Sequence, residues 1–145
     1  MKTAVEVAQQ FFERYGAHDL NGMIACFSTE GQIEYLPMQL SGPASAAGVG
    51  VWSTLIDAFP DLSNEITSTY FDAHASAAVI EVTISGTQAK DAFGIANRGQ
   101  HFKLPHVFIV KTYDSGLIYS MKAYWDNQQL IESLTRSSTA CNDKA

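Results

Sequence analysis

The sequence predicts an α+β fold in which helices come first and an antiparallel sheet follows. Apolar residues recur at helical spacing in three segments of the first 60 residues, whereas residues 65–125 alternate and are rich in β-branched side chains. Short turn sequences join most of the later segments, which is typical of strands that run antiparallel to one another. Helices grouped ahead of strands favour a layered α+β domain over an alternating α/β one.

The composition fits a single acidic globular domain. The chain has 145 residues, of which 46% are hydrophobic and 17% charged, with a formal net charge of −6. A chain of this length can bury a core of its own. The acidic balance and the lack of a lysine and arginine run argue against nucleic-acid binding, which needs positive charge opposite the phosphates. No stretch approaches the roughly 20 apolar residues of a membrane span, and the N-terminus has no apolar signal core. We therefore expect a cytoplasmic protein without a membrane partner.

The first half of the chain predicts three helices and one short strand. An amphipathic helix is expected over residues 2–16, and Asp19 has the residue type of an N-cap for a short second helix. Residues 32–36 predict a strand that Pro37 stops. The third helix is expected to start at residues 41–43, with Pro43 near its first position.

The second half predicts four strands and a closing helix. The strands are expected at residues 65–71, 76–87, 100–112 and 117–125, and the helix at residues 126–135. The third of these strands places Leu104, His106 and Phe108 on one face, because side chains alternate along a strand. Lys103 shares the opposite face with His101.

Six short motifs follow one another in a recognisable order. They are residues 17–22 (AHDLNG), 58–62 (AFPDL), 85–87 (SGT), 93–95 (FGI) with 98–99 (RG), 114–118 (DSGLI) and 124–126 (YWD). Over about residues 3–135 the chain resembles the SnoaL-like polyketide cyclases, within the superfamily of ketosteroid isomerase and nuclear transport factor 2. The resemblance implies a cone-shaped barrel in which N-terminal helices pack on a curved antiparallel sheet and enclose an apolar pocket.

The same resemblance implies a domain extent, an assembly and a range of activities. We expect one domain over residues 1–135, a flexible tail over residues 136–145, and a homodimer. The outer sheet face would carry Val79, Glu81, Thr83 and Ser85. Relatives include cofactor-free cyclases, isomerases, epoxide hydrolases and proteins without a demonstrated reaction, so fold alone does not specify the chemistry.

The pattern of ketosteroid isomerase is incomplete in this chain. That enzyme uses a carboxylate base with a tyrosine and a protonated carboxylic acid at the oxyanion. The matching places here hold Tyr35, Phe11 and His106. Because the base and the acid are both absent, we do not expect a steroid isomerase of that mechanism.

The acid of the similar cyclases, an aspartate on the last strand, has two possible positions here. One placement puts it at Asp126. The other keeps Met121, Ala123 and Trp125 facing inward and puts it at Ala123, so that the acid is missing. A shift of one residue reverses every side chain of a strand, and both placements stay open at this stage.

Three residues are candidates for catalysis. His106 interrupts an apolar row, and its neutral imidazole can exchange a proton near neutral pH, although a backbone carbonyl or Tyr35 could equally well satisfy it in the core. Tyr35 is expected to face the pocket, with Glu34 outward, because an unpaired buried carboxylate is costly. Asp126 is the third candidate, although it directly precedes the last helix and could simply cap it.

Further side chains are expected to line the pocket, and no cofactor is expected. The predicted lining residues are Phe11, Phe12, Tyr15, Trp52, Leu104, Phe108, Met121, Ala123 and Trp125. The dispersed histidines, together with Cys26 and Cys141, lack the spacing of a metal site or a disulfide framework. No phosphate-cradling glycine motif is present.

Three functions therefore compete. The first is a small cofactor-independent cyclase or isomerase, in the lyase or isomerase class, that transfers a proton next to a carbonyl of an apolar, oxygenated, polyketide-like molecule. In it, His106 or Asp126 would move the proton and Tyr35 would hold the oxyanion. An epoxide hydrolase on the same fold would need inward carboxylates. A non-catalytic binding protein would be favoured by Ala123 at the acid position and by a His106 tied to the backbone.

Overall fold

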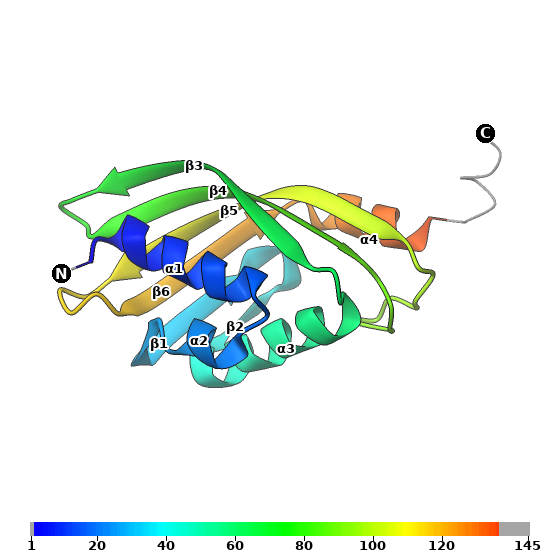
Figure 1. Ribbon diagram of the computed structural model, residues 1–145, viewed down its shortest axis with the longest axis horizontal. Coiled ribbons are helices and arrows are strands. Elements are labelled where there is room, and N and C mark those ends of the chain that lie inside the picture. Colours follow the sequence, from blue (N-terminus) through cyan, green and yellow to red (C-terminus); the bar gives the residue numbers. More distant parts are fainter. Residues whose placement is uncertain (1, 137–145) are drawn as a thin grey trace.

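Six strands form one curved sheet (Figure 1). They are β1 (Phe27–Tyr35), β2 (Leu40–Pro43), β3 (Ser63–Asp72), β4 (Ala77–Thr87), β5 (His101–Thr112) and β6 (Ile118–Trp125). Their order across the sheet is β2-β1-β6-β5-β4-β3. This computed structural model describes residues 2–136, so Cys141 and residues 137–145 of the predicted tail lie outside the described residues.

The strand pairing is antiparallel except at one place. β3, β4, β5 and β6 form the predicted meander, and β1 pairs antiparallel with β2. β1 and β6 run parallel, with Tyr35 opposite Ala123. This pairing was not predicted, because the two strands are far apart in the sequence and no turn joins them. The α+β class with a curved sheet is confirmed, and the sheet is mixed.

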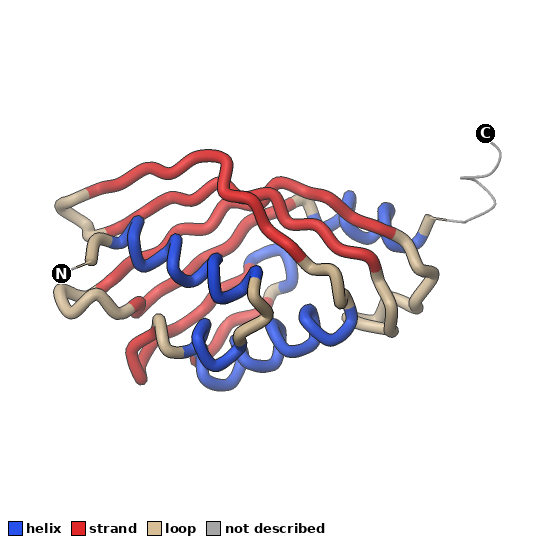
Figure 2. The backbone as a smooth tube through the Cα atoms, in the orientation of Figure 1, coloured by secondary structure: helices blue, strands red, loops and turns tan. Residues whose placement is uncertain are grey.

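Four helices accompany the sheet, three before the meander and one after it. They are α1 (Ala4–Gly16), α2 (Leu20–Ile24), α3 (Val49–Ala58) and α4 (Asn127–Thr135), together with a 3₁₀ turn, η1 (Leu36–Met38), and a π-helical turn, η2 (Ala44–Gly48). The tube drawing shows α1 across the concave side of the sheet and α4 at the far end (Figure 2). None of the helices described is long and apolar enough to cross a membrane.

Polar side chains set where several helices begin. Thr3 and Glu6 form a reciprocal capping box ahead of α1. Asp19 accepts a hydrogen bond from the Gly22 amide at 2.9 Å and caps α2 as expected.

The third helical segment begins at Ala44, directly after the predicted start at Pro43, but its first turn is π-helical rather than α-helical. Pro43 ends β2, and regular α-helix begins only at Val49, after η2. Proline is tolerated there because β2 is an edge strand, where a missing N–H leaves no partner unsatisfied.

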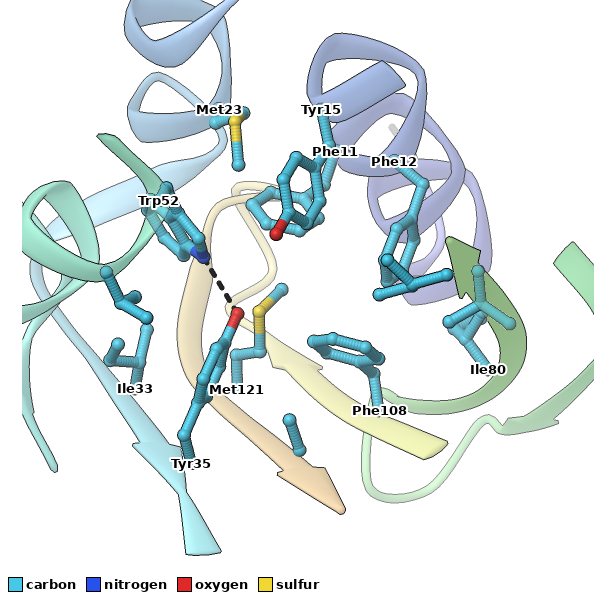
Figure 3. Close-up of a cluster of buried hydrophobic side chains, with 14 of the residues drawn as sticks. Phe11, Phe12, Tyr15, Met23, Ile33, Tyr35, Trp52, Ile80, Phe108 and Met121 are labelled. Carbon is cyan, nitrogen blue, oxygen red and sulfur yellow. Dashed lines mark hydrogen bonds between the residues drawn. The ribbon is translucent and has the colours of Figure 1, made fainter. Parts of the chain in front are cut away.

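An aromatic core fills the space between α1, α3 and the sheet (Figure 3). The Phe11 ring packs edge-on against Trp52 at 5.3 Å and against Phe27 at 5.9 Å between ring centroids. Phe12 meets Phe108 of β5 at 4.9 Å. These contacts fix α1 and α3 against the sheet, which places the side chains of the site described below.

Candidate functional site

A cavity of about 660 Å³ opens beside this core. Its walls come from α1, β1, η1, β2, η2, α3, β4, the β4–β5 loop, β5, β6 and α4. Most of the lining is apolar. No lysine, arginine, aspartate or glutamate is among the described residues that line it. Within residues 2–136, no group of three or more histidine, cysteine, aspartate or glutamate side chains could hold a metal ion.

Six lining side chains carry a polar group. They are Tyr15, Tyr35, Gln39, His106, Trp125 and Asn127. The Trp125 indole N–H is already used, because it donates to Asn127 Oδ1 at 3.1 Å. A ligand therefore meets only a few uncharged hydrogen-bonding groups.

His106 lines this cavity, and its ring has one unprotonated nitrogen. Its side chain is 8% exposed, and Nδ1 lies 3.0 Å from the Leu104 carbonyl oxygen. A carbonyl only accepts, so Nδ1–H is the donor, and the neutral ring then carries its lone pair on Nε2. Burial lowers the pKa of His106 from its usual 6.5 to about 4, against the smaller raising effect of the Leu104 carbonyl. The imidazole is thus neutral at physiological pH.

Aromatic contacts bring His106 and Tyr35 to the same wall. The indole of Trp125 stacks on the His106 ring at 5.1 Å and meets the Tyr35 ring edge-on at 5.6 Å. Phe108 lies 6.2 Å from His106 and 6.0 Å from Tyr35. Because both rings are packed on Trp125 and Phe108, neither candidate side chain is free to leave the cavity wall.

Tyr35 is held by a tryptophan on α3. The Trp52 indole N–H donates to the Tyr35 hydroxyl oxygen at 2.7 Å, and both side chains are buried. Burial raises the pKa of Tyr35 above its usual 10. The phenol therefore remains protonated and can donate a hydrogen bond into the cavity.

Asp126 lies outside the cavity lining and caps α4. Its side chain is exposed, and Oδ1 accepts from the Gln129 amide at 3.0 Å. On β6, Met121 and Ala123 are fully buried, whereas Tyr124 is exposed, so the inward alternation places Ala123 beside Tyr35. The structure thus brings His106 and Tyr35 together and leaves Asp126 apart from them.

The capping contact of Asp126 predicts how the residue responds to substitution. Asp126→Ala should lower the free energy of unfolding by about 1 kcal/mol, because it leaves the Gln129 amide without its cap, while Asp126→Asn should change it by only a few tenths. Urea titrations of both variants measure the difference. Equal losses in the two variants would contradict the capping role.

Of the nine predicted lining residues, three reach the cavity. These are Tyr15, Phe108 and Trp125. The others are buried but do not touch it: Phe11, Phe12, Trp52, Leu104, Met121 and Ala123. An inward-facing side chain does not line a cavity when its neighbours cover it. Phe11, for example, is enclosed by the rings of Phe12, Phe27 and Trp52.

Loop and helix residues at the outer part of the cavity were not predicted. Gln39 follows η1 with φ of 52°, and Phe93 in the β4–β5 loop has φ of 53°. Ile131 of α4 also lines the cavity and is 42% exposed. The sequence signal for the loop was the pair of large apolar residues, Phe93 and Ile95, between two strands. Asp91 of that loop accepts a hydrogen bond from the Asn97 amide at 2.8 Å, which holds the loop together.

The lowered pKa of His106 predicts a pH dependence of stability. Between pH 6.5 and pH 4, His106 binds a proton in the unfolded chain but stays neutral in the folded protein. The free energy of unfolding therefore falls as the pH falls through this window, and His106 does not change it above pH 6.5. The loss at pH 4 should be about 2–3 kcal/mol. Urea titrations at pH 7 and pH 4 should show a smaller loss for His106→Asn, which lacks the titrating ring. Equal losses in the two proteins would contradict the lowered pKa.

The structure is that of a small α+β protein with a partly open cavity, and the described residues that line the cavity include no lysine, arginine, aspartate or glutamate. The family model described as the SnoaL-like domain matches residues 8–121. The chain therefore belongs to the SnoaL-like family. A comparison with curated protein sequences gives no match.

Solved structures share this fold at low sequence identity. A candidate SnoaL-like polyketide cyclase from Jannaschia sp. CCS1 has a TM-score of 0.81 at 14% identity, covering 92% of each chain. AclR, a candidate hydroxylase from Streptomyces galilaeus, has a TM-score of 0.76 at 20% identity and covers 88% of this chain and 92% of its own. A protein of ketosteroid isomerase-like fold from Catenulispora acidiphila, solved with trimethylamine, has a TM-score of 0.76 at 14% identity and covers 94% and 98%. At these identities the likeness establishes the fold and not the reaction.

Proposed function

We propose that this protein is a cofactor-independent cyclase or isomerase that moves a proton next to a carbonyl of a neutral, apolar, oxygenated molecule. The observation that carries the proposal is the His106 ring, whose Nε2 lone pair belongs to a cavity-lining side chain and is bound to no described residue. His106 would take the proton, and Tyr35 would donate a hydrogen bond to the oxygen that gains charge. Family membership supports a polyketide-like substrate, and we propose a cytoplasmic setting for the reaction.

The base suits this task because of its surroundings. A histidine with a pKa of about 4 is a weak base, but it is unprotonated at any physiological pH. The cavity offers no charged group that would compete for the proton among its described lining residues. Asp126 is not needed for this step, since its carboxylate is engaged at the start of α4.

A binding protein without catalysis is the second candidate. It is favoured by Ala123 at the inward position on β6 and by the bond between His106 Nδ1 and the Leu104 carbonyl. An epoxide hydrolase receives no such support, because water activation needs carboxylates and none is among the described lining residues.

Hydrogen exchange separates the first two candidates. Bicyclic and tricyclic ketones, including α-tetralone, are incubated with the protein in D₂O, and deuterium uptake next to the carbonyl is followed by NMR. Displacement of the neutral dye Nile red reports binding in the same samples. If the protein is an enzyme, at least one bound ketone should exchange the hydrogens next to its carbonyl faster than it does in buffer. Ketones that bind without any acceleration would leave the binding protein as the function.

We also propose that two copies pair through the outer face of the sheet. Val79 and Ile109 are directly opposite on β4 and β5, and both are half-buried although no described element covers that face. Tyr70 on β3 is 55% exposed and donates to Glu81 at 2.7 Å on the same face. Size-exclusion chromatography at two concentrations should give twice the mass of one chain, and Ile109→Glu should give the monomer. A monomeric native protein would contradict the pairing.

A further inference from the structure

Two tyrosine side chains reach the part of the cavity that borders the aromatic core. Tyr15 comes from α1 and Tyr35 from the end of β1, and each side chain is 3% exposed while lining the cavity. Their phenol oxygens point toward the same interior space (Figure 3). Burial raises the pKa of Tyr15 well above its usual value, and the Tyr35 phenol adds a smaller raising effect.

Trp52 determines which way the Tyr35 hydroxyl donates. An indole N–H can only donate, so the Tyr35 oxygen is the acceptor of the 2.7 Å bond. The Tyr35 proton must therefore point away from Trp52. No described residue accepts it, so it remains available for a ligand.

Tyr15 offers a second hydroxyl that the protein itself does not use. No described residue hydrogen-bonds to it, although the side chain is almost fully buried. The Tyr15 oxygen is not one of the described side-chain atoms that are closed to solvent and lack a partner, which fits a hydroxyl that opens onto the cavity and can donate to a ligand there. Burial raises the pKa of both phenols, and both therefore stay neutral donors.

We infer that Tyr15 and Tyr35 together bind one neutral carbonyl oxygen of the ligand, and that Trp52 is a positioning residue for the Tyr35 hydroxyl. A carbonyl oxygen has two lone pairs and can accept from both phenols. A carboxylate fits poorly, because no cation is among the described lining residues and an unpaired buried charge is costly. The ligand class is thus a ketone or quinone rather than a free acid.

This assignment deepens the proposed function and rests on it for the role of His106. The Phe108 ring lies 6.0 Å from the Tyr35 ring and 6.2 Å from the His106 ring, which stands two residues before it on β5. His106 and Tyr35 are therefore separate groups on one wall, linked through the rings of Phe108 and Trp125. This separation suits removal of a hydrogen from a carbon near the carbonyl.

The binding of two molecules that differ only in a carbonyl group tests whether Tyr15 and Tyr35 bind that oxygen, and it needs no reaction. Fluorenone and fluorene share their ring system, and only fluorenone has the carbonyl. Equilibrium dialysis should show that the native protein prefers fluorenone, and that Tyr15→Phe and Tyr35→Phe each weaken fluorenone binding about three- to tenfold with fluorene unchanged. Tyr113→Phe, at an exposed tyrosine outside the cavity lining, is the control and should change neither. Equal affinities for the two molecules in the native protein would overturn the assignment.

A double-mutant cycle tests the positioning role of Trp52. Trp52→Phe should weaken fluorenone binding in the native background and have no further effect when combined with Tyr35→Phe. Because Trp52 is fully buried, incorporation of benzothienylalanine at this position, which replaces the N–H with sulfur, provides a second variant of nearly equal shape. Equal losses with and without the Tyr35 hydroxyl, in either variant, would show that Trp52 acts by packing alone and would overturn this role.

The outcomes separate this inference from the proposed reaction. The protein could select fluorenone through both tyrosines and yet accelerate no hydrogen exchange. That result would support binding of the carbonyl oxygen by Tyr15 and Tyr35 and would contradict the proposed enzymatic reaction. Hydrogen exchange that depends on His106, in a protein that does not prefer fluorenone, would support the proposed reaction and contradict the binding of the carbonyl oxygen by Tyr15 and Tyr35.

Discussion

His106→Asn is expected to slow protein-catalysed hydrogen exchange next to the ketone carbonyl by at least about 100-fold. Asparagine can still donate an N–H to the Leu104 carbonyl, which His106 contacts at 3.0 Å, but it has no basic nitrogen to take a proton. The ketone should still bind, because the tyrosines and the apolar wall remain. Exchange rates by NMR and Nile red displacement measure the two effects separately.

A histidine outside the cavity provides the matched control. His101 lies on the same strand, is exposed, and contacts the Thr87 hydroxyl at 2.8 Å. His101→Asn should leave exchange unchanged. If His106→Asn kept its rate within twofold of the native protein, His106 would not be the base.

Trp52→Ala is expected to lower the free energy of unfolding by about 3–5 kcal/mol. Trp52 is fully buried, and its ring contacts Phe11 at 5.3 Å and Phe27 at 5.6 Å. The substitution removes these contacts and leaves a void in the core. It also leaves the Tyr35 hydroxyl oxygen without its donor. Urea titration with a constant m-value would measure the loss.

Trp125→Ala is the comparison for this effect. Trp125 lines the cavity and is only half-buried, so one side of its ring already lacks protein neighbours. The substitution should therefore cost less stability than Trp52→Ala and should weaken ketone binding. A greater loss at Trp125 than at Trp52 would contradict the division between core and cavity wall.

The elements with a strong local pattern could be predicted from the sequence. The helix expected over residues 2–16 is α1, and the strands expected over residues 76–87 and 100–112 are β4 and β5 within one residue at each end. In these segments the spacing of apolar residues and the caps agree with the final packing. The β1–β6 pairing could not be predicted, because it joins strands that are distant along the chain.

Of the candidate site, only the direction in which the side chains of each strand face could be predicted from the sequence. Alternation placed Leu104, His106 and Phe108 on one inner face, and all three are buried there. It could not tell lining from core, because that depends on which neighbouring side chains cover a residue. It also could not predict the outer part of the cavity, where Gln39 and Phe93 adopt positive φ angles in loops. Nor does periodicity reveal the Trp52–Tyr35 contact, which requires the packing of α3 on the sheet.

The central claim is that a neutral, buried His106 is the base of an uncharged cavity. The most direct measurement is the rate of deuterium uptake by a saturating ketone from pH 8 to pH 5.5, above the protein's isoelectric point near 5.0. After subtraction of the buffer rate, the rate per protein should stay constant across this range, because a base with a pKa of about 4 remains unprotonated throughout. A rate that falls by half near pH 6.5 would mean that the base titrates as an ordinary exposed histidine, and would contradict the account.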